Sequence, residues 1–345
     1  MKKQIVGLLS AMVFLCAGTA IASDWNFYGS ARVSTFWEDS DLKDQVDFSE
    51  GLQSNARIGA KVKVSDELTG RFEYGTSGGN ANIRLLYGAW DFGAGTLTVG
   101  QDYTPMYLPV SCQVWNDDNG LHGYGDPYPG RHPQIKLKFD EFQIAAISTN
   151  TTYYTVGGGT SSANTQVVIP RIEVSYGINM GGNAGIDIAA GYTTFEYNDN
   201  EDVDSYVIMI RSTAQIAGFK LGTVVFYGQN AGNMIACNTS GTDYGKGYAA
   251  INTGTGQVDD VENFGAEIVV GYTFDEMFAI EAGFGSMQNE YDSASSGDGL
   301  FAYYLQAPIT LAPGVTITPE IGLIDYYEDT QDQITYFGAK WQINF

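Results

Sequence analysis

The chain has 345 residues, with 17 Lys and Arg against 40 Asp and Glu and a formal net charge of −23. Its 44% apolar content excludes a disordered chain, and its 17% charged content is below the roughly 25% typical of soluble domains. The acidic balance excludes a cationic nucleic-acid-binding protein, because phosphate contacts need Lys and Arg. With only three cysteines in this length, a small disulfide-stapled domain is excluded as well.

The first 22 residues are predicted to be a cleaved secretory signal peptide. Lys2 and Lys3 give a positive start, an apolar run over 5–17 follows, and small residues precede a cut after Ala22. This run is too short for a membrane-spanning helix, and no later run of about 18 apolar residues follows. Residues 23–345 are therefore expected to form one exported domain.

Apolar and polar residues alternate with a period of two along almost all of that domain, which is typical of β-strands. In the segment 264–272, for example, Phe264, Ile268 and Tyr272 share one face and Glu267 lies on the other. We expect about sixteen such segments of roughly 9–14 residues, long enough to cross a bilayer at a tilt. Short turns alternate with long loops, which predicts an all-β, transmembrane, antiparallel up-and-down β-barrel.

The ionisable side chains in these segments share one parity, as Lys61, Glu281 and Glu320 illustrate. An Arg or Lys facing lipid at mid-depth costs about 2–4 kcal/mol. A closed barrel with an apolar outside and a wet inside therefore explains the pattern. A water-soluble barrel or sandwich would show the same alternation with its faces exchanged, so the signal peptide, the strand number and the chain terminus decide in favour of the membrane barrel.

The last ten residues resemble the C-terminal insertion signal of Gram-negative outer-membrane barrels. Phe337, Trp341, Ile343 and the terminal Phe345 lie on one face of the last predicted strand. Such an apolar strand suits recognition by strand pairing. The resemblance implies that the barrel-assembly machinery binds this strand during export to the outer membrane.

The segments 54–61 and 87–101 resemble the second strand, and the strand–turn–strand before the inward-folded third loop, of general porins of Gram-negative bacteria. The likeness covers most of the mature chain, although the family's commonest acidic tip sequence is missing from the loop 104–133. The resemblance implies a sixteen-stranded barrel with this loop folded into the lumen. It also implies a homotrimer among outer-membrane lipid and lipopolysaccharide that lets small hydrophilic solutes diffuse through.

Basic side chains in the first part of the chain are expected to line one wall of the lumen. They are Arg32, Arg57, Lys61, Arg71, Arg84 and Lys136. Asp117, Asp118 and Asp126 in the third loop are expected to face them, which predicts a transverse field at the narrowest point. The many carboxylates elsewhere predict a mild preference for cations. For the acidic loops, a solvated surface or divalent cations bridging lipopolysaccharide is the simpler interpretation.

Other chemistry finds little support in the sequence. His122 and His132 both fall in the third loop, so no strand carries the histidine that a Ser–His–acid hydrolase needs. Neither enzymatic activity nor a cofactor or metal is expected. Cys112 and Cys237 fall in two long loops of an oxidising compartment, and both a disulfide and two free thiols stay open.

The sequence leaves two classes of function. The first is a passive diffusion channel, and the second is a structural or adhesion barrel whose extracellular loops bind a partner. A substrate-selective porin is a variant of the first class that needs an aromatic track, for which Tyr28, Phe36 and Trp90 are too scattered. Stepwise, ohmic single-channel conductance would favour a channel.

Overall fold

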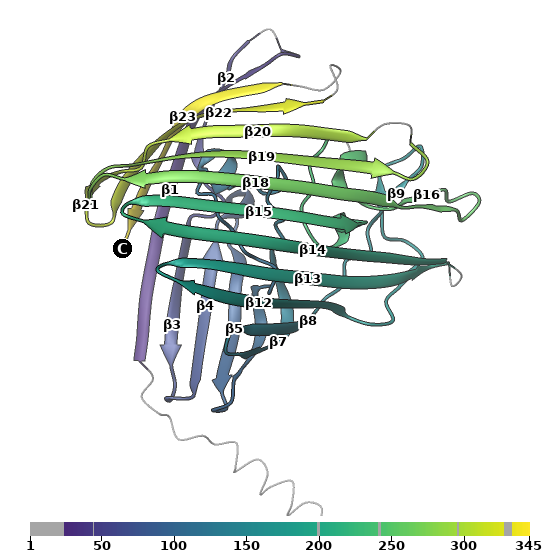
Figure 1. Cartoon of the computed structure of the whole chain (residues 1–345), viewed down its shortest axis with the longest axis horizontal. Helices are drawn as coiled ribbons and strands as arrows, with labels where there is room; N and C mark the ends of the chain where they lie inside the picture. The colour runs from purple at the N-terminus through teal and green to yellow at the C-terminus, as the bar shows by residue number, and fades with distance from the viewer. Residues whose placement is uncertain (1–23, 44, 199–200, 241–242, 295–296, 328–332) are drawn as a thin grey trace, which may run out of the picture.

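The computed structural model describes residues 24–43, 45–198, 201–240, 243–294, 297–327 and 333–345, and the predicted signal peptide lies outside them. The described chain forms one large sheet that closes into a barrel, with a second, four-stranded sheet in its long loops (Figure 1). Helical turns in the described part are short: η1 (Ser77–Gly79), α2 (Trp115–Asp118), η2 (Ala231–Asn233) and η3 (Asp243–Lys246). Among the described residues, no helix has the length and apolar character needed to span a membrane.

The strands follow one another around the barrel in chain order. The first group is β1 (Asp24–Ser40), β2 (Asp47–Leu52), β3 (Arg57–Lys63), β4 (Leu68–Gly75), β5 (Asn82–Asp91), β6 (Thr96–Tyr103), β7 (Arg131–Phe139) and β8 (Phe142–Ile147). The second group is β11 (Thr165–Gln166), β12 (Arg171–Gly181), β13 (Ala184–Tyr197), β14 (Glu201–Ile216), β15 (Phe219–Gln229), β18 (Val261–Thr273), β19 (Ala279–Tyr291), β20 (Asp298–Gln306), β21 (Ile309–Ala312), β22 (Val315–Tyr326) and β23 (Ile334–Asn344). The small loop sheet contains β9 (Tyr153–Thr155), β10 (Thr160–Ser161), β16 (Ala250–Ile251) and β17 (Val258–Asp259).

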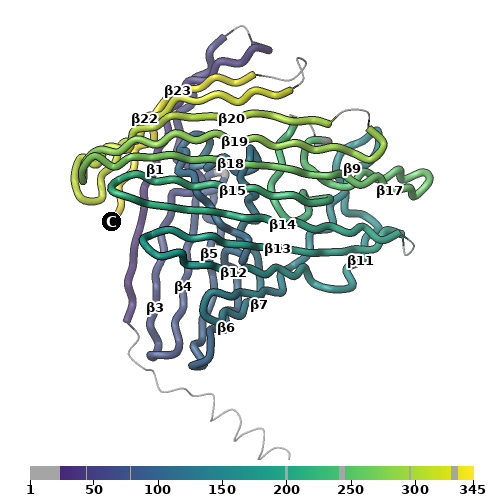
Figure 2. The backbone as a smooth tube through the Cα atoms, in the orientation of Figure 1, coloured from purple at the N-terminus to yellow at the C-terminus, as the bar shows by residue number. Residues whose placement is uncertain are grey.

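The first and last strands close the barrel. β1 pairs antiparallel with β23 over its outer half, from Ser30 opposite Asn344 to Ser40 opposite Ile334, and Figure 2 shows the C-terminal end beside β1. The nineteen strands of the large sheet give a wall of sixteen positions, because β2 and β3 share the partner β1, β11 and β12 share β13, and β20 and β21 share β22. The prediction of a closed antiparallel barrel of about sixteen strands is confirmed.

Alternation along each strand separates an apolar outside from the barrel interior. On β14, Ile208 and Ile210 are each 50% exposed, whereas Val207 and Met209 are each 1% exposed. A continuous surface of exposed aliphatic and aromatic side chains is unfavourable in water and suits the hydrocarbon of a bilayer. The buried set faces inward, where it packs against loops that enter the barrel.

The C-terminal residues that resemble an insertion signal lie on the outer face, as the sequence predicts. Phe337, Trp341, Ile343 and Phe345 are 50%, 47%, 53% and 73% exposed. Phe337 stacks on Trp37 of β1, with ring centroids 5.2 Å apart. The outward placement is confirmed, and the role of these residues in membrane insertion stays a prediction.

The barrel wall has unequal height around its circumference. β13 and β14 have 14 and 16 residues, whereas β3 and β8 have 7 and 6. Figure 1 shows the long teal and green strands in front of the shorter blue ones. The low wall also carries Arg57, Arg71 and Arg84, so the basic side of the lumen coincides with the short strands.

Replacing Ile210 by Arg should destabilise the folded barrel, because the new guanidinium would face hydrocarbon near the middle of β14. The expected loss in free energy of unfolding is about 2–4 kcal/mol, measured by urea titration in lipid vesicles. Thr213 lies three residues away on the inward face of the same strand. The control Thr213→Arg should cost much less, and an equal cost for both variants would contradict the assignment of faces.

Candidate functional site

The loop between β6 and β7, residues 104–130, crosses the interior of the barrel. Near its start the Met106 N–H donates to Glu173 on β12, at 3.1 Å. Farther along, Asp118 accepts a hydrogen bond from Arg32 on β1, at 2.6 Å. Because these partners belong to different parts of the wall, the loop narrows the lumen. It occupies the place that the sequence predicts for the third loop.

Buried glutamates of the wall hold the middle of this loop by its backbone. The Cys112 N–H donates to Glu281 at 2.8 Å, and the N–H groups of Val114 and Trp115 donate to Glu320 at 2.6 and 3.1 Å. Each of these bonds gives an acceptor to a backbone N–H group that the loop carries away from bulk solvent. The inward parity of these glutamates is visible in the sequence, but their role as anchors for a loop about 170–200 positions away is not.

Apolar contacts fix the same loop on both sides. Trp115 stacks on Tyr336 of β23 with ring centroids 4.6 Å apart. Met106 and Val110 pack in a buried cluster with Phe226 of β15. The loop is therefore packed as firmly as a protein core, and it forms a fixed constriction.

The tip of the loop is a left-handed turn. Asn116, Asp117 and Asp118 have φ of 49°, 65° and 57°. Asn and Asp tolerate this region better than other residues that carry a Cβ atom. The sequence Asn-Asp-Asp thus permits a turn that directs two neighbouring carboxylates toward the wall.

Of the two acids at the tip of the loop, Asp118 lies against basic side chains of the wall, whereas Asp117 contacts a backbone N–H group. Asp118 lies 2.6 Å from the Arg32 guanidinium and 3.0 Å from the Lys340 ammonium group. Asp117 accepts a hydrogen bond from the Ser54 N–H at 3.0 Å, in the gap between β2 and β3. This gap in the strand leaves backbone groups free to bind the loop.

The basic wall is organised around one buried carboxylate. Glu73 on β4 is 1% exposed and lies 3.4, 3.1 and 2.8 Å from the guanidinium groups of Arg57, Arg71 and Arg84. Three cations sharing one anion leave a surplus of positive charge toward the lumen. Three arginines of the predicted basic wall thus lie together around Glu73, and their role in lining a pore stays a prediction.

The two predicted wall lysines lie outside this cluster. Lys136 on β7 pairs with Asp102 on β6 at 2.7 Å. Lys61 is exposed on β3, opposite Arg71 in the strand register, and none of the ion pairs in the described ranges includes it. Neither lysine contacts the tip of the loop.

Arg84 reaches the lumen through a β-bulge. Leu86 and Trp90, at the same parity on β5, are 50% and 51% exposed on the outer face, whereas Arg84 is 6% exposed. The register between β4 and β5 shifts between Glu73 and Tyr74, which inserts one extra residue on β5. Such a bulge redirects a side chain across the sheet, so strict alternation alone would have placed Arg84 outward.

Asp126 does not face the basic wall, contrary to the sequence prediction. It is 2% exposed and lies beside Glu267 of β18, with His122 Nε2 3.2 Å from its Oδ2 atom. Gly125 has φ of 135°, and a Cβ there would lie 2.6 Å from the Ala266 carbonyl oxygen. This close approach turns the chain toward β18 after the tip, which local sequence does not reveal. Burial raises the pKa of Asp126 to about 8.

The two loop cysteines are not bonded to each other. Cys112 is exposed in the lumen with its sulfur 3.7 Å from Lys220 Nζ, whereas Cys237 is buried in an apolar cluster. Of the two alternatives that the sequence leaves open, the structure has the two free thiols. Loop membership alone could not place the two sulfurs, because each loop folds against a different part of the wall.

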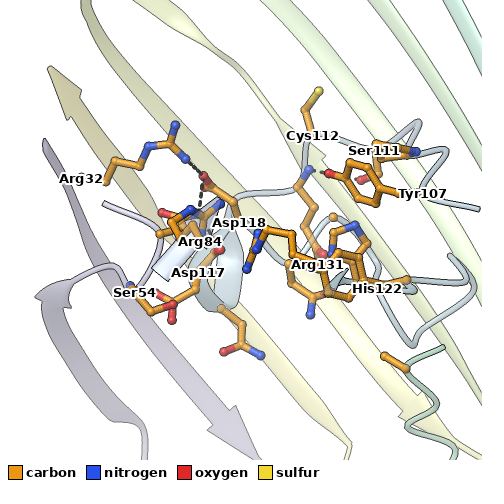
Figure 3. Close-up of a pocket in the computed structure, with 18 of the residues that line it drawn as sticks. Arg32, Ser54, Arg84, Tyr107, Ser111, Cys112, Asp117, Asp118, His122 and Arg131 are labelled. Atoms are coloured by element: carbon orange, nitrogen blue, oxygen red, sulfur yellow. Dashed lines mark hydrogen bonds and ion pairs between the residues drawn. The ribbon is translucent and has the colours of Figure 1, made fainter. Parts of the chain in front are cut away.

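A cavity of about 670 Å³ lies between the loop and the basic wall (Figure 3). Four half-buried rings line it in two stacked pairs, Tyr103 with Tyr107 at 4.0 Å and His122 with Tyr128 at 4.1 Å between centroids. The pattern of aromatic residues on the strands does not predict this ring group, because three of its four rings belong to the loop. The density of Tyr and His over residues 103–128 was the available signal.

The described ranges contain no group of three or more His, Cys, Asp or Glu side chains placed to hold a metal ion. The chemistry of the cavity is that of guanidinium groups, carboxylates, amides and aromatic rings. Such groups bind and orient a solute through charge, hydrogen bonds and stacking.

The attachment of the loop at Asp126 should weaken as pH rises through about 8. The raised pKa means that the folded protein binds a proton there which the unfolded chain releases near pH 4, so stability falls between these values as pH increases. Thermal unfolding in detergent should give a higher Tm at pH 6 than at pH 9. Glu267, His122 and Arg211 are the charged or titratable groups around Asp126.

Asp126→Asn should flatten this dependence, because the amide has no proton to lose. Asp118→Asn is the matched control, since it changes an acid of the same loop that pairs with cations instead. An unchanged pH profile in Asp126→Asn would contradict the role given to this carboxyl.

Comparison with known proteins identifies the fold. No protein-family model and no curated protein sequence matches the chain. Among solved structures, the outer membrane channel DcaP of Acinetobacter baumannii has a TM-score of 0.75 at 14% identity, over 95% of this chain and 99% of that one. OmpT, an outer membrane protein of Vibrio cholerae, has a TM-score of 0.63 at 14% identity, over 94% and 99%. An anion-selective porin from Comamonas acidovorans has a TM-score of 0.61 at 11% identity, over 94% and 100%.

These similarities extend over nearly the full length of each chain, at identities that establish fold alone. Together with the sixteen closed strands, they confirm the fold predicted from the resemblance to general porins. The chain has the architecture of a bacterial outer-membrane porin.

Proposed function

We propose that the chain is a diffusion channel of the bacterial outer membrane that passes small hydrophilic solutes and ions. A sixteen-stranded barrel is wide enough to hold an aqueous passage. The observation that carries the proposal is the polar cavity of about 670 Å³ between the loop 104–130 and the arginine wall. A barrel serving only as a scaffold for outer loops would have no need of a charged constriction in its lumen.

The constriction sorts solutes by size and by polarity. Charged groups on both sides favour a solute that can exchange its hydration for hydrogen bonds, and they disfavour an apolar one. Asp118 on the loop and Arg32 on the wall supply the opposed charges of the predicted transverse field. Because Asp118 and Arg32 are in direct contact, their charges largely offset each other. Arg57, Arg84 and Arg131 are the other arginines that line the cavity.

Ion preference follows from two regions of opposite sign. The net charge of −23 favours cations at the mouths, which is the basis of the mild cation preference predicted from the sequence. The cations of the constriction oppose it over the narrowest part of the path. We therefore expect a weak overall preference that depends on single charges in the cavity.

Assembly as a homotrimer is part of the same proposal. The low wall, β3 to β8, exposes apolar side chains such as Leu86, Val99 and Ile135 at 50%, 51% and 58%. Short strands present little height to lipid and suit contact with neighbouring subunits. One of the similar solved structures, OmpT of Vibrio cholerae, is described as a trimer form.

Residues 1–22 would direct export, and the assembly machinery would pair with β23 before it closes on β1. Lipid and lipopolysaccharide would contact the outer face and the acidic loops. These steps rest on the sequence resemblance and on the outward placement of Phe337, Trp341, Ile343 and Phe345.

Single-channel recording in planar bilayers tests the channel directly. We expect stepwise, ohmic openings, and a folded barrel that inserts without conducting would overturn the proposal.

Lys340→Gln should shift the reversal potential in a salt gradient toward cation preference. The substitution removes a cation from the cavity, while Asp118 stays paired with Arg32.

Lys63→Gln is the matched control for this shift. Lys63 pairs with Asp66 at 2.7 Å near a short turn, away from the cavity. It should change the reversal potential much less than Lys340→Gln does. Equal shifts would mean that the constriction does not control ion preference.

A further inference from the structure

Arg131 carries a charge that no carboxylate neutralises within the described residues. It lies at the start of β7, where its guanidinium donates to the Tyr103 hydroxyl at 2.9 Å and sits 5.2 Å from the centre of that ring. The ion pairs of the described chain give carboxylate partners to Arg32, Arg57 and Arg84, but not to Arg131. A guanidinium held this way has donors left for a ligand.

The surroundings of Arg131 strengthen its attraction for an anion. The cavity is lined by five cations and two carboxylates, namely Arg32, Arg57, Arg84, Arg131, Lys340, Asp117 and Asp118. Both Arg131 and Arg84 are close enough to Tyr128 for their charges to oppose the rise that burial causes in its pKa. Figure 3 shows Arg84 and Arg131 on neighbouring positions of the cavity. Two guanidinium groups therefore converge on the same space.

Aromatic rings border that space on the side opposite Arg32. Tyr107 stacks on Tyr103 with one face, and it meets His122 and Tyr128 edge-on, at 61° and 76°. Its second face is therefore not stacked on a ring of the described chain. Figure 3 shows Tyr107, His122 and Arg131 on the side of the cavity away from Arg32.

His122 adds a neutral ring to this group. Burial and the nearby charge of Arg131 lower the pKa of His122 to about 3, so the imidazole is uncharged at neutral pH. The neutral imidazole therefore adds neither a positive nor a negative charge to the cavity. The rings beside the arginines thus carry no full charge, which suits contact with another aromatic ring.

We propose that the cavity is a binding site for aromatic carboxylates, with Arg131 and Arg84 holding the carboxylate group and Tyr107 contacting the ring. This inference rests on the proposed channel function and names the class of solute that the constriction retains. A carboxylate accepts two parallel hydrogen bonds from a guanidinium group. A small inorganic anion would use the arginines alone, and a neutral aromatic solute would use the rings alone.

Binding is measured on the folded, detergent-solubilised protein by saturation-transfer NMR, which does not depend on ion conduction. Benzoate is the probe, acetate supplies the carboxylate without the ring, and benzamide supplies the ring without the charge. We expect benzoate to bind more tightly than either of the other two. Equal affinity for benzoate and acetate, or for benzoate and benzamide, would overturn the proposal.

Arg131→Gln should weaken benzoate binding by about tenfold, because it removes charge-assisted hydrogen bonds. Lys138→Gln is the control: it neutralises another cation of β7, seven residues away or roughly 23 Å along the strand. Equal affinities in Arg131→Gln and Lys138→Gln would overturn the site.

Inorganic phosphate should compete with benzoate for the wild-type protein. A failure to compete would contradict a site built on arginines.

Tyr107→Leu should weaken benzoate binding by about threefold and leave acetate binding unchanged, because only the ring contact is lost. Weaker binding of both probes to the same extent would show that Tyr107 is not part of the site.

If benzoate binds but planar bilayers show no conductance, the channel proposal fails and the binding site stands. If the channel conducts but benzoate does not bind, the site fails alone.

Discussion

Hydrocarbon offers no hydrogen bonds, and this constraint governs the whole architecture. A strand exposed to lipid must pair all its backbone groups with neighbouring strands, and a sheet meets that demand only when it closes. The pairing of β1 with β23 supplies the closure. Once the ring is closed, each strand has one face in lipid and one face inside, so a period of two in the sequence becomes the division between membrane and pore.

A different constraint acts in the interior of the barrel, which is lined by polar groups. The loop 104–130 divides it, and the loop brings backbone N–H groups that need acceptors away from bulk solvent. Glu173, Glu281 and Glu320 provide them. These three wall carboxylates are thus already engaged by the backbone of the loop.

Local sequence predicts what depends on strand geometry, and it fails where distant segments meet. Alternation and the C-terminal aromatic pattern predict the barrel, its faces and the outward position of Phe337 and Phe345. The resemblance to general porins predicts an inward-folded loop over 104–133, and Asp118 of this loop lies beside Arg32 and Lys340. Asp126 is misplaced by the same prediction, since its burial depends on Gly125 pressing against Ala266 about 140 residues later. Arg84 turns inward at a bulge, where β5 carries one residue more than β4 between Tyr74 and Glu73.

The net charge of the chain and the sign of its constriction are therefore independent properties. Acids dominate the sequence, but most of those inside the barrel are already bound, by backbone groups or by several cations at once. Glu73 is shared by three arginines and Asp118 by Arg32 and Lys340. Each shared carboxylate leaves an excess of positive charge, so an acidic protein forms a cationic cavity beside the loop 104–130. The potential that a solute meets there is set by which charges remain uncompensated, and this can be read only from the folded arrangement.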